Sequence, residues 1–95
     1  MTFLRRSRFA ELVEQQLALF AGDERELLAE AVEAEEAWSR AGRDEAEEAY
    51  GDYQLVVDAI ADRLLDLRET YAATLDEATA AEYRGAFNRA AGKRY

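Results

Sequence analysis

With 95 residues, no proline and a 49% share of hydrophobic residues, many of them alanine, the sequence predicts a single helical domain over 1–95 with a thin core. The absence of cysteine and histidine removes the thiolate and imidazole ligands of most transition-metal sites and the commonest acid–base side chains. We therefore expect no enzyme activity, no cofactor and no metal site. The net charge of −9 disfavours contact with phosphate backbones, so nucleic acid is not an expected partner.

The first predicted helix carries apolar residues at spacings of three and four. These are Phe9, Leu12, Val13, Leu17 and Phe20. Gly22 follows the stripe, and a glycine in this position predicts that the helix ends there. The residues before the stripe include Arg5, Arg6 and Arg8 and hold no continuous apolar stretch. We therefore expect no secretory signal, no membrane span, no membrane partner and a cytoplasmic location.

Two capping signals define the second and third helices. Asp23 precedes Glu26 by three residues, a spacing at which both side chains can satisfy free backbone N–H groups at a helix start. Asp44 and Glu47 repeat this spacing. Gly42 directly follows Ala41 at the end of the second helix and precedes the Asp44 cap, so the second helix is expected to end at Gly42 in a left-handed conformation. Because the turn before Asp44 is short, the second and third helices are predicted to form an antiparallel hairpin.

The third helix, expected over about 45–73, has the clearest pattern in the chain. Its apolar seam recurs at alternating spacings of three and four: Tyr50, Tyr53, Val57, Ile60, Leu64, Leu67 and Tyr71. This pattern is typical of a coiled coil and predicts one long spine helix. The pattern changes within 73–79, where Thr74 or Thr79 is expected to start a fourth helix that ends at Gly92.

These elements predict an all-α, four-helix bundle-like domain with an antiparallel helical hairpin and one long spine helix. We expect the first two helices to pack along the first half of the spine and the fourth to fold over its second half. At 1.5 Å per residue the spine is roughly 43 Å long and the first two helices are each nearer 25 Å, so an apolar strip would stay uncovered. We therefore expect a homodimer that buries this strip. Its interface residues are predicted to be Leu64, Leu67, Tyr71, Leu75, Tyr83 and Phe87.

Carboxylates recur along two of the predicted helices without indicating a metal site. Asp58, Asp62 and Asp66 share one helix face that lies off the apolar seam. Glu33 and Glu36 lie three residues apart on the second helix. Carboxylate-bridged di-iron bundles pair such glutamates with histidine, which this chain lacks. We interpret these carboxylates as a solvated face.

The function that this pattern favours is a non-catalytic helical interaction or assembly module that associates first of all with itself, with a protein partner as a further possibility. The alternative is a small-molecule or anion-binding regulatory protein that uses aromatic residues and the basic ends of the chain. The aromatic residues are Tyr50, Tyr53, Tyr71, Tyr83 and Phe87. The basic residues are Arg5, Arg6 and Arg8 at one end and Arg84, Arg89, Lys93 and Arg94 at the other.

A third hypothesis rests on a resemblance. A small, acidic, cysteine-free helical hairpin is similar to the WXG-type secreted proteins of Gram-positive bacteria, which implies a secreted helical-hairpin effector. Three residues separate Trp38 from Gly42, whereas the family has a single residue between tryptophan and glycine. Tyr71 and Tyr83 are each followed four residues later by an apolar residue instead of the acidic one of the secretion signature. Membership is therefore not indicated, and the arginine- and alanine-rich usage favours only a bacterial source.

Overall fold

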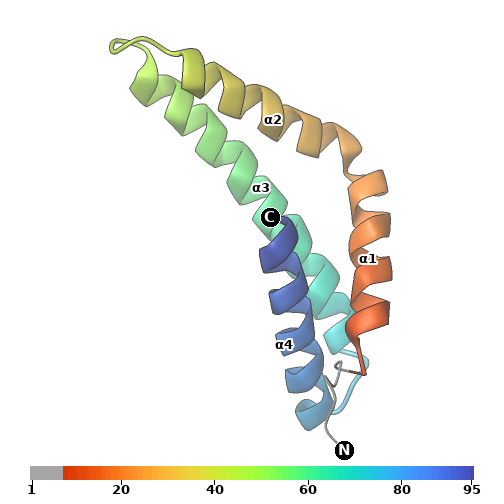
Figure 1. Cartoon of the computed structure of the whole chain (residues 1–95). Helices are drawn as coiled ribbons and strands as arrows, with labels where there is room; N and C mark the ends of the chain where they lie inside the picture. Colours follow the sequence, from red (N-terminus) through yellow and green to blue (C-terminus); the bar gives the residue numbers. More distant parts are fainter. Residues whose placement is uncertain (1–7) are drawn as a thin grey trace, which may run out of the picture. The chain divides into compact units, whose positions relative to one another are not determined.

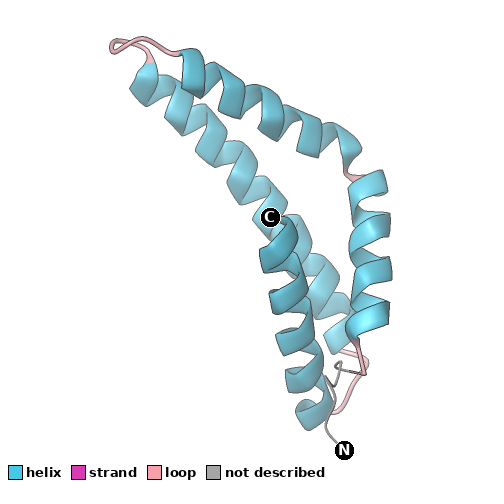
Figure 2. Ribbon diagram, viewed as in Figure 1, coloured by secondary structure: helices cyan, strands magenta, loops and turns pink. Residues whose placement is uncertain are grey.

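The computed structural model describes residues 8–95, and every regular element in this part of the chain is a helix (Figures 1 and 2). The helices are α1 (Ala10–Asp23), α2 (Arg25–Arg40), α3 (Ala46–Ala72) and α4 (Glu77–Arg94). They pack against one another, which confirms the all-α, bundle-like fold class. The bounds of α3 lie within one residue of those expected for the spine helix. None of the helices described is long and apolar enough to cross a membrane.

The junction of α1 and α2 differs from the sequence prediction. Helix α1 continues through Gly22 to Asp23, and Glu24 alone separates it from α2. The predicted stop at Gly22 and the predicted cap at Asp23 are therefore wrong. The physical reason is that one residue with non-helical backbone, Glu24 at φ −105° and ψ 27°, separates the helices: its carbonyl accepts a hydrogen bond from the Leu28 N–H at 2.9 Å, and no side chain caps the start of α2.

The turn between α2 and α3 also forms without the predicted device. No glycine in the described residues has a positive φ, so the left-handed conformation expected at Gly42 is wrong. Instead, the N–H of Ala41, a residue with extended backbone, donates to the Trp38 carbonyl at 3.2 Å and closes α2. The Gly42 carbonyl then accepts from the Glu45 N–H at 3.0 Å. Two tight turns in succession thus reverse the chain.

Helix α4 begins inside the interval predicted for the break, but neither threonine is its cap. The Asp76 carboxylate accepts hydrogen bonds from the N–H and the hydroxyl of Thr79, both at 2.9 Å. A carboxylate in this position also interacts favourably with the positive end of the helix dipole. The Thr74 hydroxyl instead donates to the Tyr71 carbonyl at 2.7 Å and ends α3. Helix α4 passes Gly92 and ends at Arg94.

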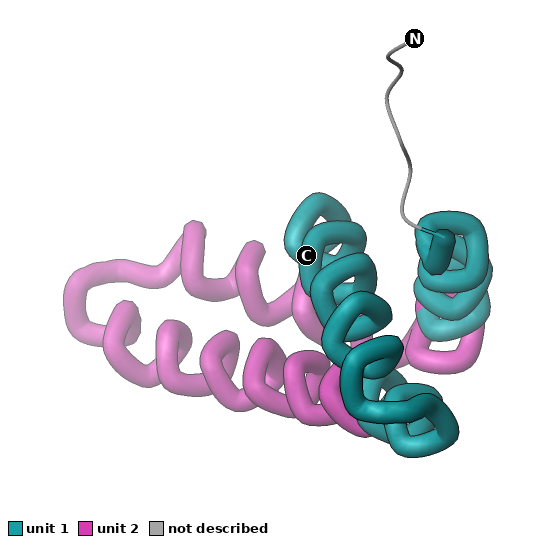
Figure 3. The backbone as a smooth tube through the Cα atoms, turned by 90° about the horizontal axis from the view of Figure 1, so that it is seen from below, with its two compact units in different colours: residues 1–20, 67–95 teal, residues 21–66 magenta. Residues whose placement is uncertain are grey.

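The chain divides into two compact units (Figure 3). The core unit consists of residues 1–20 and 67–95, and the hairpin unit of residues 21–66. Most of α1 therefore belongs with α4 and the end of α3, which corrects the expectation that the first helix packs along the first half of the spine. Its place is fixed by contacts of its apolar stripe with α4. The single domain expected over 1–95 stays a prediction.

The core unit encloses a compact apolar interior centred on Tyr83. This side chain has no exposed surface, and its ring lies 5.5 Å from that of Phe9, 4.8 Å from that of Tyr71 and 6.0 Å from that of Phe87, between ring centroids. Its hydroxyl donates to the Gln16 side-chain oxygen at 2.8 Å. Apolar bulk and a satisfied hydroxyl are what a buried tyrosine requires. The other buried apolar residues of this unit are Phe9, Val13, Leu17, Phe20, Ala72, Ala80, Ala86 and Phe87.

The hairpin unit pairs α2 with the first part of α3 (Figure 1) and buries few side chains. Helix α2 contains no buried residue, and within 21–66 only Ile60 is buried. The seam of α2 consists instead of half-buried residues at helical spacing: Leu27, Leu28, Ala31 and Ala34. Two helices alone bury only the surface between them, so each keeps its flanks open.

Candidate functional site

The most distinctive surface of the hairpin unit is a groove of about 490 Å³ between α2 and α3. Its lining combines apolar and acidic residues: Glu30, Glu33, Ala34 and Ala37 on α2, and Ala49, Asp52, Leu55 and Val56 on α3. The four residues of α2 follow the i, i+3, i+4, i+7 spacing that places side chains on one helix face. We call this surface the acidic groove.

The acidic groove leaves a large apolar side chain in solvent. Leu55 is 70% exposed, although it lies in the middle of a long helix and next to the half-buried Val56. On the facing helix, Ala37 is exposed and Ala34 is half-buried. The floor is therefore apolar and open, and its small residues would let another helix approach closely.

Two clamps hold the helices of the hairpin on either side of the acidic groove. At the turn end, the Trp38 ring stacks on Tyr53 at 5.5 Å and meets the edge of Tyr50 at 4.8 Å, between ring centroids. At the other end, the Arg63 guanidinium donates to both carboxylate oxygens of Glu24 at 2.7 and 2.8 Å. Aromatic packing and an ion pair therefore connect the two helices of the hairpin at both ends.

The electrostatic character of the hairpin unit is strongly negative. Residues 21–66 contain fifteen acidic and four basic side chains, a net charge of −11. Three of the acids line the acidic groove, and they come from both helices, so carboxylates stand on both rims. A cation near this surface would be attracted from either side.

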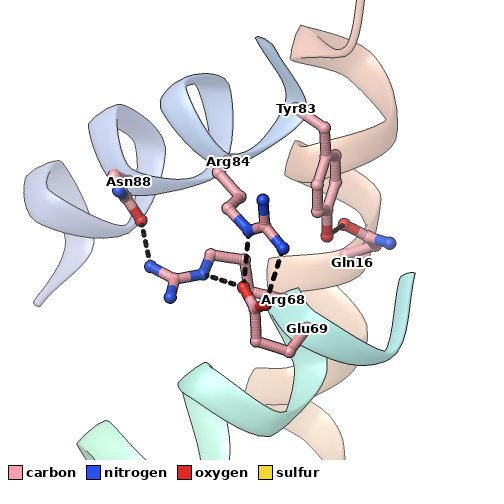
Figure 4. A network of polar contacts seen from close by, with 6 residues as sticks. All are labelled: Gln16, Arg68, Glu69, Tyr83, Arg84 and Asn88. Carbon is pink, nitrogen blue, oxygen red and sulfur yellow. Dashed lines mark hydrogen bonds and ion pairs between the residues drawn. The ribbon is translucent and has the colours of Figure 1, made fainter. Parts of the chain in front are cut away.

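A network of polar contacts occupies one side of the core unit (Figure 4). Glu69 accepts hydrogen bonds from Arg84 at 2.8 and 2.9 Å and from Arg68 at 2.8 Å, while Arg68 also donates to Asn88 at 2.9 Å. The hydrogen bonds from Arg84 and then Arg68 lower the pKa of Glu69 to about 2. Burial raises the pKa of Tyr83 above its usual value. The network ties the end of α3 to α4 through charge-assisted hydrogen bonds.

The six interface residues predicted from the sequence do not form one open strip. Tyr83 and Phe87 are 0% and 2% exposed and lie in the interior of the core unit. The other four are half-buried: Leu64, Leu67, Tyr71 and Leu75. Within the core unit, α1 and α4 supply the apolar cover that was expected from a second copy. The homodimer itself stays a prediction.

The aromatic and basic residues of the alternative hypothesis are distributed over both units. Tyr50 and Tyr53 pack on Trp38 in the hairpin unit, whereas Tyr71, Tyr83 and Phe87 pack together in the core unit. Each unit therefore holds its own group of aromatic residues.

Several basic residues of the chain ends are engaged in ion pairs within the core unit. Arg8 pairs with Glu82 at 3.2 Å, and Arg94 pairs with Glu14 at 3.0 Å. Arg84 is held by Glu69. Arg5 and Arg6 lie outside the described residues, and Arg89 and Lys93 are exposed or lie in the last turns of α4. Three of the described basic residues named in the alternative hypothesis, Arg8, Arg84 and Arg94, are therefore engaged within the core unit.

The carboxylates interpreted as a solvated face are exposed, as expected. Asp58, Asp62 and Asp66 are exposed on α3, and Asp58 accepts a hydrogen bond from Gln54 at 3.1 Å. Glu33 and Glu36 are exposed on α2. Within residues 8–95, no three acidic side chains converge in an arrangement that would hold a metal ion.

The acidic groove was not predicted from the sequence, because the apolar seam indicates only the residues that lie between the helices. Leu55 was the available signal, because it lies outside the seam on a helix whose other large apolar residues mostly follow the heptad pattern. The fold and its surface define a helical protein with an open, acidic hairpin. No protein-family model, curated protein or solved structure matches this chain.

Proposed function

We propose that this chain is a non-catalytic helical interaction module whose hairpin unit binds another helix. The observation that carries the proposal is the open state of the hairpin: α2 has no buried residue, and Leu55 is 70% exposed beside it. Helical bundles normally cover such apolar flanks with a third or fourth helix. A flank left open on a preformed pair of helices is typical of an interaction surface.

Site-specific photocrosslinking tests this proposal in the cells that produce the protein. A photoreactive residue at position 55 should yield a discrete protein adduct, because that side chain stands in the acidic groove. The matched control is position 19, since Leu19 on α1 is 68% exposed and belongs to the core unit. Equal adducts at both positions, or none at position 55, would contradict an interaction surface on the hairpin.

Self-association is a second form of the same function, and one observation favours it. Leu65 on α3 is 46% exposed and adjoins Leu64, which belongs to the interface predicted from the sequence. Sedimentation equilibrium at micromolar concentration should then show a dimer that Leu65→Glu dissociates. This substitution is preferable to Leu67→Glu, because Leu67 is more buried and its replacement would also disturb folding. A wild-type monomer would refute this form.

A further inference from the structure

We propose that the acidic groove binds a basic amphipathic helix from another protein, with apolar residues on its floor and lysine or arginine on both rims. The inference rests on the proposed interaction function and names the partner's chemistry. Two observations support it: the floor of the acidic groove is apolar and exposed, and carboxylates lie on opposite sides of this floor.

The floor of the acidic groove fits an α-helix. Its lining covers residues 30–37 of α2 and 49–56 of α3, and eight helical residues at 1.5 Å each give a track of roughly 12 Å, the length of about two helical turns. Ala34 and Ala37 on one side and Ala49 on the other leave room for leucine-sized side chains of a third helix. Leu55 and Val56 provide the apolar surface that such side chains would remove from water.

The rims select the charge of that helix. Glu30 and Glu33 stand on α2, and Asp52 stands on α3, so carboxylates flank the floor on both sides. A helix with an apolar stripe and basic residues on each side of it would place a cation against each rim. The net charge of −11 on the hairpin unit would also accelerate its approach.

The same charges disfavour a second copy of this chain in the acidic groove. Face-to-face pairing of two hairpins would bring Glu30, Glu33 and Asp52 of one copy against the same residues of the other. Each hairpin carries −11, so the pairing would bury like charges without a counterion. A basic helix removes this repulsion and replaces it with attraction.

The test titrates the full chain into fluorescein-labelled peptides and follows fluorescence anisotropy. The probes are 18-residue amphipathic helices with leucine at i, i+3, i+4 and i+7 in several registers, flanked by lysine and arginine. Matched peptides carry glutamate at the flanking positions, or the same basic composition in scrambled order. We expect saturable binding of the ordered basic peptides, weaker binding at high salt, and little binding of either control.

Variants of the chain locate the binding surface. Leu55→Gln should weaken binding about tenfold by removing apolar contact, and its exposure means that the fold should tolerate the change. Glu30→Gln with Glu33→Gln should weaken binding about three- to tenfold. The matched control, Glu35→Gln with Glu36→Gln, makes the same charge change on α2 outside the acidic groove, and should alter affinity less than about twofold.

Three results would overturn the inference. The first is the absence of binding by every ordered basic peptide up to about 1 mM, the range of weak complexes. The second is equal loss of affinity in the groove variant and in the Glu35→Gln, Glu36→Gln control. The third is self-association that Leu55→Gln abolishes, because a second copy would then be the occupant. If crosslinking from position 55 still captures a protein while the peptides fail, the interaction function stands and the partner chemistry is wrong.

Discussion

The two units of this chain have nearly the same length and opposite physical character. The core unit has 49 residues, eight basic and six acidic, for a net charge of +2, whereas the 46-residue hairpin unit carries −11. Of the ten buried apolar side chains in the described residues, nine belong to the core unit and only Ile60 to the hairpin. The core unit therefore contains most of the buried apolar side chains and has the smaller net charge.

Because of this difference, we expect the core unit to provide most of the stability and the hairpin unit to provide the surface for interaction. Burial of apolar surface is the main favourable term in folding, so substitutions inside the core unit should dominate the free energy of unfolding. The hairpin unit gains less from burial and carries strong self-repulsion, which a basic partner would relieve. A chain with one closed unit and one open unit can therefore stay folded while it presents a binding surface.

The sharpest test of the comparison exchanges one tyrosine in each unit for alanine. Tyr83→Ala should lower the free energy of unfolding by about 3–5 kcal/mol, because it empties a fully buried aromatic site. Tyr50→Ala should cost about 1 kcal/mol, since Tyr50 is 45% exposed and loses mainly one ring contact with Trp38. Urea denaturation monitored by circular dichroism measures both.

A gentler variant covers the case in which Tyr83→Ala does not fold. Tyr83→Phe keeps the ring and removes only the hydrogen bond to Gln16, so it should cost about 1 kcal/mol. Equal costs for the alanine variants of Tyr83 and Tyr50 would contradict the division of the chain into a closed and an open unit.

A smaller effect should follow from the carboxylate at the centre of the polar network. Glu69 has its pKa lowered to about 2 in the folded state, so its contribution to stability is fully present above its ordinary pKa of 4.5 and is lost as the pH falls toward 2. Glu69→Gln should therefore be less stable than wild type at pH 6, and the difference should vanish near pH 2.

Denaturation midpoints measured from pH 2 to pH 7 test this expectation. Glu36→Gln, which removes one exposed charge from α2, is the control and should stay close to wild type throughout. A Glu69→Gln defect that persists unchanged at pH 2 would show that the side chain acts by packing and not by its charge.

The helices could be predicted from the sequence, whereas the way in which they pack together could not. The apolar seam of α3 gave a helix within one residue of its true bounds, because a strict repeat over three heptads has no other regular solution. Helix ends were less predictable. Gly42 was expected as a left-handed stop, but glycine permits that conformation without requiring it, and the hydrogen bond from the Ala41 N–H to the Trp38 carbonyl closes α2 instead.

The candidate site could not be predicted because it depends on which helices pair. The seam residues Leu67 and Tyr71 were expected to be open, and the structure half-buries them in the core unit with α1 and α4. The opening is instead at Leu55, which lies outside the seam from which the interface was predicted. Periodicity identifies a helix face, whereas tertiary pairing decides whether that face is covered.

A still smaller, stabilising effect is expected at the glycine inside the spine. Gly51 lies within α3, and a Cβ atom placed there would meet no other atom within 4 Å. Gly51→Ala should therefore raise the free energy of unfolding by about 1 kcal/mol, the helix-propensity difference between the two residues. Thermal denaturation measures the gain, and a loss of stability would show that α3 needs flexibility at this point of the hairpin.

The smallest expected effect concerns Gly42 in the hairpin turn, and it distinguishes the two descriptions of that turn. A left-handed residue would make Gly42→Ala destabilising, because a side chain resists positive φ. In the structure no glycine of the described residues has positive φ, and a Cβ atom at Gly42 would meet nothing within 4 Å. Gly42→Ala should therefore change the free energy of unfolding by less than about 0.5 kcal/mol, or slightly raise it by restricting the unfolded chain. Urea midpoints of this variant and of Gly51→Ala, measured side by side, separate the cases: a destabilised Gly42→Ala beside a stabilised Gly51→Ala would restore the left-handed turn.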